Sequence, residues 1–173
     1  MPLPDLSHLK DRPSIHIMMV CLGNICRSPM AAAVLANKVS EIGSPKIIVS
    51  SSGTSSWHVG QGANPPSKRV WERAGYRHAH IASQIDHGRI EESDLILVMD
   101  SSNHADVLEL AKPSDHSKVL YLRQFDEGAT DLEVPDPYGM GDDAFERVLE
   151  MAERSVDGLL NALGVADPSG TSR

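Results

Sequence analysis

Residues 14–40 read SIHIMMVCLGNICRSPMAAAVLANKVS, and this stretch decides the fold. It opens with the apolar run 15–20, which has no polar face and is therefore typical of a strand covered on both sides. Ser28 and Pro29 then supply an N-cap residue and a proline at the first helical position, and strong helix formers follow over 30–40. This order predicts the first strand, loop and helix of a parallel sheet.

The same alternation continues along the chain. Further strands are predicted over 45–50, 95–99 and 119–122, and further helices over 67–74, 102–110 and 142–163. The sequence therefore predicts a single α/β domain over 14–164: a four-stranded parallel sheet with helices on both faces, flavodoxin-like. The ends, 1–13 and 165–173, are polar or rich in Pro, Gly and Ser and are expected to be flexible.

The composition and charge of the chain limit the classes of partner that it can bind. The 173 residues carry a formal net charge of -8, which argues against nucleic acid and anionic membranes because both reward clustered Lys and Arg. No apolar run has the length of a signal peptide or a membrane span, so we expect a cytoplasmic protein, and we expect it to be a monomer. The 8 histidines show no ligand spacing beside Cys or carboxylates, so neither a metal nor a cofactor is expected.

The loop after the first strand lies where open parallel sheets bind ligands. Gly23 and Asn24 easily adopt positive φ, so the loop can turn successive backbone N–H groups toward an anion at the helix N-terminus. Arg27 offers a planar fork for two phosphate oxygens, which a lysine cannot reproduce. These groups favour a thiolate at Cys21 and so an activated nucleophile, to which Ser28 can donate.

Simpler readings compete with this one. A cysteine six residues before an arginine also arises by chance, and in that case Cys21 would be a buried thiol and Gly23-Asn24 a common turn. The surrounding order of strand, loop and helix favours catalysis instead. For Cys26 two readings stay open: a small buried hydrophobe, or a thiol that captures oxidised Cys21 as a reversible disulfide. Trp57 and Tyr138 lie in loops with little core to join, so both are expected to contact substrate, whereas Trp71 has core spacing on its helix.

Hydrolysis of a phosphate ester also needs an acid that protonates the leaving oxygen. Several carboxylates lie on the stretch 123–137, and prolines on both sides single out Asp136 from the others, which are Asp126, Glu127, Asp131 and Glu133.

Residues 20–29 resemble the signature loop of the low-molecular-weight protein tyrosine phosphatases at every characteristic position. Weaker matches follow in order, and together the resemblance covers about 15–163. They are Ser52-Gly53-Thr54, Trp57-His58-Val59-Gly60, Met99-Asp100 with Asn103, and Pro135-Asp136-Pro137-Tyr138.

The resemblance implies hydrolysis of phosphotyrosine in proteins, or of small aryl phosphates, through a cysteinyl-phosphate intermediate. It implies that Cys21 is the nucleophile, that Arg27 clamps the phosphate and that Asp136 is the general acid and later the base. It also implies that Asn24 and Ser52 support the loop and that Trp57 and Tyr138 flank the entrance. The phosphate-binding residues it implies are Leu22, Gly23, Asn24, Ile25, Cys26, Arg27 and Ser28.

One position departs from the family pattern. Relatives commonly carry a second tyrosine after the first, where this chain has Gly139, so one aromatic wall is missing. Two alternatives remain. An arsenate reductase on the same loop is disfavoured because no cysteine follows Cys26, unless an external thiol regenerates it. A non-catalytic phosphotyrosine or oxyanion binder is disfavoured because Cys21, Arg27 and Asp136 are all present.

Overall fold

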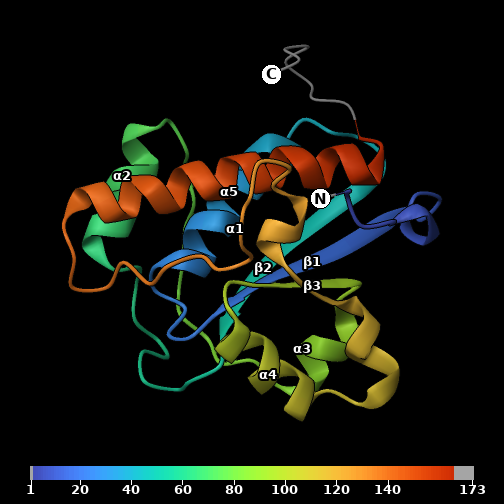
Figure 1. The fold of residues 1–173 in the computed structure, drawn as a ribbon, viewed down its shortest axis with the longest axis horizontal. Helices are drawn as coiled ribbons and strands as arrows, with labels where there is room; N and C mark the ends of the chain where they lie inside the picture. The colour runs from blue at the N-terminus through green and yellow to red at the C-terminus, as the bar shows by residue number, and fades with distance from the viewer. Residues whose placement is uncertain (1, 166–173) are drawn as a thin grey trace.

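The computed structural model describes residues 2–165, in which strands and helices alternate (Figure 1). Four parallel strands form one sheet in the order β2-β1-β3-β4: β1 (Ser14–Cys21), β2 (Lys46–Gly53), β3 (Leu95–Val98) and β4 (Val119–Tyr121). The helices are α1 (Arg27–Val39), α2 (Pro65–Arg73), α3 (His87–Glu92), α4 (Ser101–Leu110) and α5 (Asp142–Leu163), with 3-10 turns η1 (Ser7–Leu9), η2 (Pro113–Lys118) and η3 (Leu122–Phe125). The predicted α/β architecture is confirmed.

Helices cover both faces of the sheet. In Figure 1, α1, α2 and α5 lie on one side and α3 and α4 on the other. Along β1, Ile17 and Met19 belong to the apolar cluster under α1 and α5, while Met18 and Val20 belong to the cluster under α4. A strand buried on both faces needs apolar residues at successive positions, which explains the unbroken apolar run of the sequence.

The sheet order places the ligand site. The neighbours of β1 are β2 and β3, and the chain leaves β1 and β3 for helices on opposite faces of the sheet. In such sheets a crevice opens beyond the carboxyl end of the strand where the order reverses. Cys21 is the last residue of β1, so the loop that follows it lies at this crevice.

Part of the N-terminal segment packs against the core. Residues 1–13 were expected to be flexible, yet Leu6 and Leu9 are 3% and 1% exposed and pack into the cluster that includes α5. Leu3, Leu6 and Leu9 recur every third residue, but three leucines among prolines and polar residues are too short a pattern to predict burial, so only the tertiary contact reveals it. Apart from Val165, the expected flexible C-terminal end lies outside the described residues. Trp71 is fully buried, which confirms its structural role.

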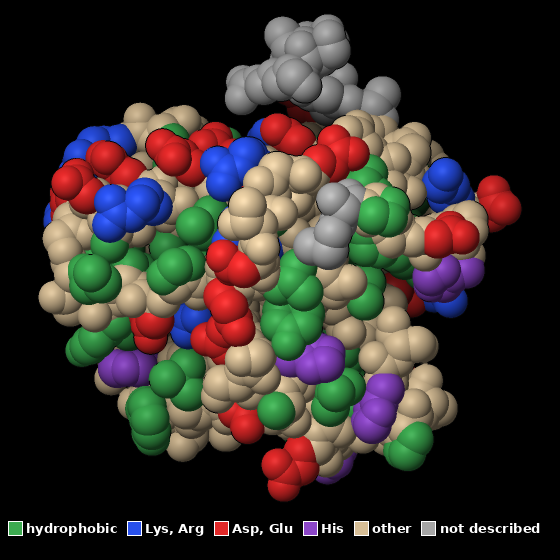
Figure 2. Space-filling view, viewed as in Figure 1, with side chains coloured by type: hydrophobic (Ala, Val, Ile, Leu, Met, Phe, Trp, Pro, Cys, Tyr) green, Lys and Arg blue, Asp and Glu red, His purple; other side chains and the backbone are tan. Residues whose placement is uncertain are grey.

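Ion pairs tie α2 to the first turn of α5. Figure 2 shows Lys and Arg mixed with Asp and Glu over these two helices, at the upper left of the view. Arg69 and Arg73 each donate to Asp142 at 2.8 Å, and these hydrogen bonds lower the pKa of Asp142 to about 2. Because Asp142 begins α5, the contact fixes the end of the loop before it. No helix within residues 2–165 is long and apolar enough to cross a membrane.

Candidate active site

The loop between β1 and α1 is shaped by one residue with left-handed backbone. Asn24 has a φ of 56°, as its residue type suggested, whereas Gly23 does not have the positive φ that was thought possible for it. Gly23 is instead placed where a Cβ would lie 3.0 Å from Cδ2 of His58. Gly53, at the end of β2, is closer still: its Cβ would lie 2.7 Å from the backbone oxygen of Leu22. The loop therefore packs directly on β2.

The backbone carbonyl oxygens of this loop bind neighbouring segments of the protein. The oxygens of Cys21 and Leu22 accept hydrogen bonds from the N–H groups of Thr54 and Ser55, both at 2.9 Å, and the oxygen of Ile25 accepts from the N–H of Asn64 at 2.9 Å. Within residues 2–165, none of the N–H groups at 22–26 donates to a protein acceptor. Five unpaired donors beside a helix N-terminus form a cradle for an oxyanion.

A chain of side chains fixes the nucleophile. Asn24 Nδ2 donates to Oγ of Ser28 at 2.7 Å and to Oγ of Ser51 at 3.0 Å, and the Ser28 oxygen lies 3.0 Å from Sγ of Cys21. With its acceptor side occupied by Asn24, the Ser28 hydroxyl can donate to the sulfur. Ser28 is not the N-cap of α1, as the sequence suggested; the helix begins at Arg27, two residues earlier than predicted, and its N-cap is Cys26.

The expected loop support by Ser52 is not what the structure shows. The Ser52 hydroxyl points to the other face of the sheet, where it contacts Met18 Sδ at 3.4 Å and accepts from Arg89 at 3.3 Å. Ser51 makes the contact with Asn24 instead. Neighbouring residues of a strand face opposite sides, so a shift of one position exchanges the two roles.

Arg27 is held with its guanidinium toward the pocket. The side chain is 3% exposed, and Nη1 donates to Asp100 Oδ2 at 2.7 Å and to the backbone oxygen of Val134 at 3.0 Å. Its Nη2 lies 3.7 Å from Oδ2 of Asp136. These contacts orient the planar group and leave N–H groups on Nη2 and Nε for an anion.

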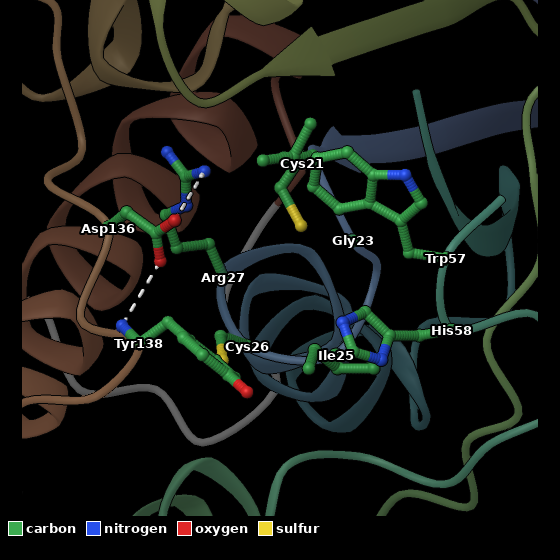
Figure 3. Close-up of a pocket in the computed structure, with 10 residues that line it drawn as sticks. Cys21, Gly23, Ile25, Cys26, Arg27, Trp57, His58, Asp136 and Tyr138 are labelled. Carbon is green, nitrogen blue, oxygen red and sulfur yellow. Dashed lines mark hydrogen bonds and ion pairs between the residues drawn. The ribbon is translucent and has the colours of Figure 1, made fainter. Parts of the chain in front are cut away.

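These residues surround one cavity of about 380 Å³. Figure 3 shows the sulfur of Cys21 pointing into it, with Asp136 and Tyr138 on one side and Trp57 and His58 on the other. The structure thus brings together the sequence-predicted residues of the loop, the acid and both aromatic walls. The lining residues are Cys21, Leu22, Gly23, Ile25, Cys26, Arg27, Trp57, His58, Asp136 and Tyr138.

The two aromatic walls are exposed. Trp57 is 71% and Tyr138 is 61% exposed, and because both line the cavity their rings are accessible to a molecule that enters it. Gly139 follows with a φ of 77°, a conformation that side chains rarely adopt. The missing second tyrosine therefore coincides with a backbone turn suited to glycine.

Cys26 is buried beside the cradle. It is 4% exposed, and Asn64 Nδ2 donates to its sulfur at 3.3 Å. Burial raises the pKa of this thiol to about 11, so it is protonated at neutral pH. Both readings from the sequence, a packing residue and a redox partner of Cys21, remain compatible with this position.

Three contributors to the site were missed from the sequence. Asp100 orients Arg27, Ser51 holds Asn24, and the ring of His80 donates through Nε2 to the backbone oxygen of Asn24 at 2.6 Å. Burial lowers the pKa of His80, so its ring is neutral. Asp100 had a usable signal, because it directly follows a predicted strand at the carboxyl edge of the sheet. Among residues 2–165, no group of three or more His, Cys, Asp or Glu side chains is placed to hold a metal ion.

Comparison with known proteins agrees with this geometry. Residues 16–167 match the family described as low molecular weight phosphotyrosine protein phosphatase. A low molecular weight protein-tyrosine-phosphatase of Streptomyces coelicolor is 40% identical, with 85% of this chain and 92% of the relative covered. The low molecular weight protein-tyrosine phosphatase A of Mycobacterium tuberculosis is 36% identical, covering 84% and 89%.

A solved structure shares both fold and sequence. The crystal structure of a protein tyrosine phosphatase from Entamoeba histolytica, with Hepes in its active site, superposes with a TM-score of 0.83 at 32% identity, covering 87% of this chain and 97% of that one. The chain therefore belongs to the low-molecular-weight phosphotyrosine protein phosphatase family.

Proposed function

We propose that this protein hydrolyses phosphotyrosine and related aryl phosphate monoesters through a phosphate covalently bound to Cys21. The observation that carries the proposal is a loop whose N–H groups at 22–26 donate to no protein acceptor in the described part of the chain and which lines the same cavity as Cys21, Arg27 and Asp136. This cradle has the donors for the three peripheral oxygens of a phosphate, with the sulfur in position to attack phosphorus.

In the first step the sulfur of Cys21 attacks phosphorus, and the bond from phosphorus to the phenolic oxygen breaks. The loop N–H groups and Arg27 hold the three peripheral oxygens as charge redistributes in the transition state. Asp136, protonated, gives its proton to the departing oxygen, so the alcohol leaves neutral. Trp57 and Tyr138 receive the aromatic ring between them.

In the second step water attacks the phosphorus of the cysteinyl phosphate. Asp136, now ionised, takes a proton from that water, and the sulfur leaves as a thiolate that Ser28 stabilises by donating its hydroxyl hydrogen. Inorganic phosphate is released and Asp136 is again protonated. The same carboxyl thus serves as acid and then as base.

The aryl substrate is favoured over arsenate by specific residues. Trp57 and Tyr138 provide apolar walls that arsenate does not need, and no cysteine follows Cys26 in the sequence to regenerate an oxidised nucleophile. The test is turnover of p-nitrophenyl phosphate, phosphotyrosine and arsenate by one preparation. We expect both aryl phosphates to be hydrolysed with a burst of phenol equal to the enzyme concentration, and arsenate to stay unreduced with glutathione. Arsenate reduction without phosphatase turnover would overturn the proposal.

We propose that the protein acts in the cytoplasm, because a nucleophilic thiol beside a second free thiol suits a reducing compartment. The net charge of -8 supports a phosphoprotein or small aryl phosphate as the partner rather than nucleic acid or an anionic membrane. We propose further that the protein acts as a monomer, because Cys21, Arg27 and Asp136 already meet at one cavity within a single chain; sedimentation tests this directly.

A further inference from the structure

Asp136 lies on a segment that has neither helix nor strand, between η3 and α5. Its carboxyl is 45% exposed and lies 3.7 Å from Arg27. The other carboxyl oxygen accepts from the N–H of Tyr138 at 3.1 Å, a contact inside the same turn. The place of this carboxyl above the pocket therefore depends on what holds the chain just before it.

Arg123, on η3, holds that chain. The residue is 6% exposed, and its Nη1 donates to the backbone oxygen of Glu133 at 2.7 Å and to Oδ1 of Asp131 at 3.1 Å. The same Asp131 oxygen accepts from the N–H of Glu133 at 2.8 Å. One guanidinium thus closes a turn three residues before Asp136.

The guanidinium of Arg123 is itself anchored to the core. Its Nε lies 3.7 Å from Oδ2 of Asp126, which is 2% exposed. Arg154, on α5, donates to the same oxygen at 3.2 Å. The turn before Asp136 is therefore connected to the longest helix of the fold rather than to another loop.

Glu133 makes a second connection, to the N-terminus of α4. Its Oε2 accepts from the N–H of Ser101 at 3.0 Å, where a carboxylate is favoured by the helix dipole. The preceding residue, Asp100, accepts from Arg27 at 2.7 Å. One helix terminus therefore sets both the phosphate clamp and the chain that leads to the acid, and the N–H of Val134 adds a bond of 2.7 Å to Met99.

We propose that Arg123 and Glu133 are positioning residues that keep Asp136 within proton-transfer reach of the leaving oxygen. The inference rests on the proposed function. Neither side chain lines the pocket, so both act through Asp136 rather than on the substrate. A misplacement of about 1 Å can cost about a hundredfold in rate. The loss falls on both steps in which Asp136 moves a proton, and only the first of them depends on the leaving group.

The experiment compares two substrates that differ in how much they need an acid. Phenyl phosphate has a poor leaving group and p-nitrophenyl phosphate a good one. For Arg123→Lys and Glu133→Ala we expect kcat/KM with phenyl phosphate to fall about tenfold more than kcat/KM with p-nitrophenyl phosphate, because kcat/KM reports the step in which the leaving group departs. Glu133→Gln keeps an oxygen that accepts from the Ser101 N–H, so it should retain most of the rate that Glu133→Ala loses with phenyl phosphate. Equal losses with both substrates would overturn the proposal.

A double-mutant cycle separates positioning from general damage to the fold. In an Asp136→Asn background no acid is left to place, so Glu133→Ala should cause no further loss with phenyl phosphate. A structural role would lower the rate by the same factor in both backgrounds and would overturn the assignment. Glu133→Ala leaves the buried Arg123 pair intact, so the cycle can be measured even if Arg123→Lys does not fold.

Lys38→Gln serves as the matched control. The substitution removes the ion pair of 2.5 Å between Lys38 on α1 and Asp157 on α5. Neither residue belongs to the segment 126–141, which carries Asp136. We expect it to lower thermal stability without changing the ratio of the rates with the two substrates; a changed ratio would contradict the assignment.

If the wild type hydrolyses neither substrate, the proposed function fails. If wild type and Asp136→Asn behave as expected and Glu133→Ala keeps the wild-type ratio, only the inference fails.

Discussion

The two segments that meet at the pocket are built in opposite ways. In the loop 21–28, all residues from Asn24 to Ser28 are buried, and the carbonyl oxygens of Cys21, Leu22 and Ile25 accept hydrogen bonds from neighbouring segments. In the segment 126–141, Asp136 is 45%, Tyr138 61% and Met140 59% exposed. In the proposed mechanism the buried segment binds the phosphate, which all substrates share, and the exposed segment faces the leaving group, in which they differ.

This difference has a physical basis. Donors stabilise a transition state best when they are already oriented, because no energy is then spent on turning them during the reaction. A group that transfers a proton to a departing oxygen must instead leave room for substrate to enter and product to leave. Predictions for the loop therefore concern all substrates alike, and predictions for the acid segment depend on the substrate.

The largest effect is expected for Cys21→Ser. The hydroxyl has nearly the volume of the thiol but lacks the nucleophilicity of a thiolate, so turnover of every aryl phosphate should fall to background. Thermal unfolding should stay close to that of the wild type, because the side chain still fits beside Ser28. Appreciable residual turnover in a preparation free of wild-type enzyme would contradict the covalent mechanism.

The next largest effect is expected for Arg27→Lys. A lysine cannot keep the bonds to Asp100 and Val134 while also presenting two N–H groups to phosphate. We expect kcat to fall about a hundred- to a thousandfold, by a similar factor for good and poor leaving groups. Steady-state kinetics with both substrates measures this. A change within twofold would mean that Arg27 does not clamp the phosphate.

Asp136→Asn should separate the two segments most clearly. Asparagine keeps the shape of the side chain but cannot act as the acid, so kcat/KM with phenyl phosphate should fall about 10²- to 10⁴-fold. The loss with p-nitrophenyl phosphate should be much smaller, because its leaving group departs without full protonation. Identical losses with the two substrates would exclude the acid role of Asp136.

A matched pair of glycine substitutions tests the difference in rigidity. In Gly53→Ala the new Cβ would meet the Leu22 oxygen at 2.7 Å and the Asn24 nitrogen at 3.1 Å, so the cradle must shift. We expect kcat/KM to fall about tenfold or more for every substrate. Gly139→Ala meets no atom within 4 Å and bears only the strain of its positive φ, about 1–2 kcal/mol of stability. Kinetics and thermal melts of both variants measure these effects; the reverse order would contradict the comparison.

The buried segment was also the more predictable one. Apolar runs marked the strands, and the spacing of Cys21, Gly23, Asn24 and Arg27 marked the loop, because local sequence dictates a buried strand, a turn and a helix start. What local sequence could not decide was which of two adjacent serines of β2 supports the loop. Ser51 pairs with Met19 in the sheet and Ser52 with Val20, so only the register assigns their faces.

The residues that hold the segment before Asp136 show no sequence pattern. Arg123 and Glu133 appeared only among polar residues near Asp136, and Glu133 binds Ser101, which is 32 residues away. In the loop after β1, the support by His80 was also missed, because His80 lies in an irregular stretch with no pattern. The helix α3 was also missed, because six residues with one buried side chain show no helical period. Each of these features becomes visible only when the tertiary structure brings its partner near.

The smallest effect on turnover is expected for Cys26→Ala, and it concerns oxidation. The Cys26 thiol neither attacks the phosphate nor protonates the leaving group, so kcat should stay near the wild-type value under reducing conditions. If Cys26 is the resolving thiol, hydrogen peroxide should convert Cys21 to a sulfenic acid, which Cys26 attacks to form a disulfide with loss of water. Dithiothreitol should then restore the wild type fully, but not Cys26→Ala, whose Cys21 proceeds to higher oxides.

The raised pKa of Cys26 sharpens this test. The thiolate is the attacking form, and with a pKa of about 11 its fraction grows as pH rises from 7 toward 10. At a fixed peroxide concentration, the share of activity that dithiothreitol recovers in the wild type should therefore increase with pH, while recovery in Cys26→Ala stays low throughout. Bound phosphate should protect both proteins, because it fills the cradle and covers the Cys21 sulfur. Equal recovery of the two proteins at every pH would show that Cys26 is a packing residue of the buried segment.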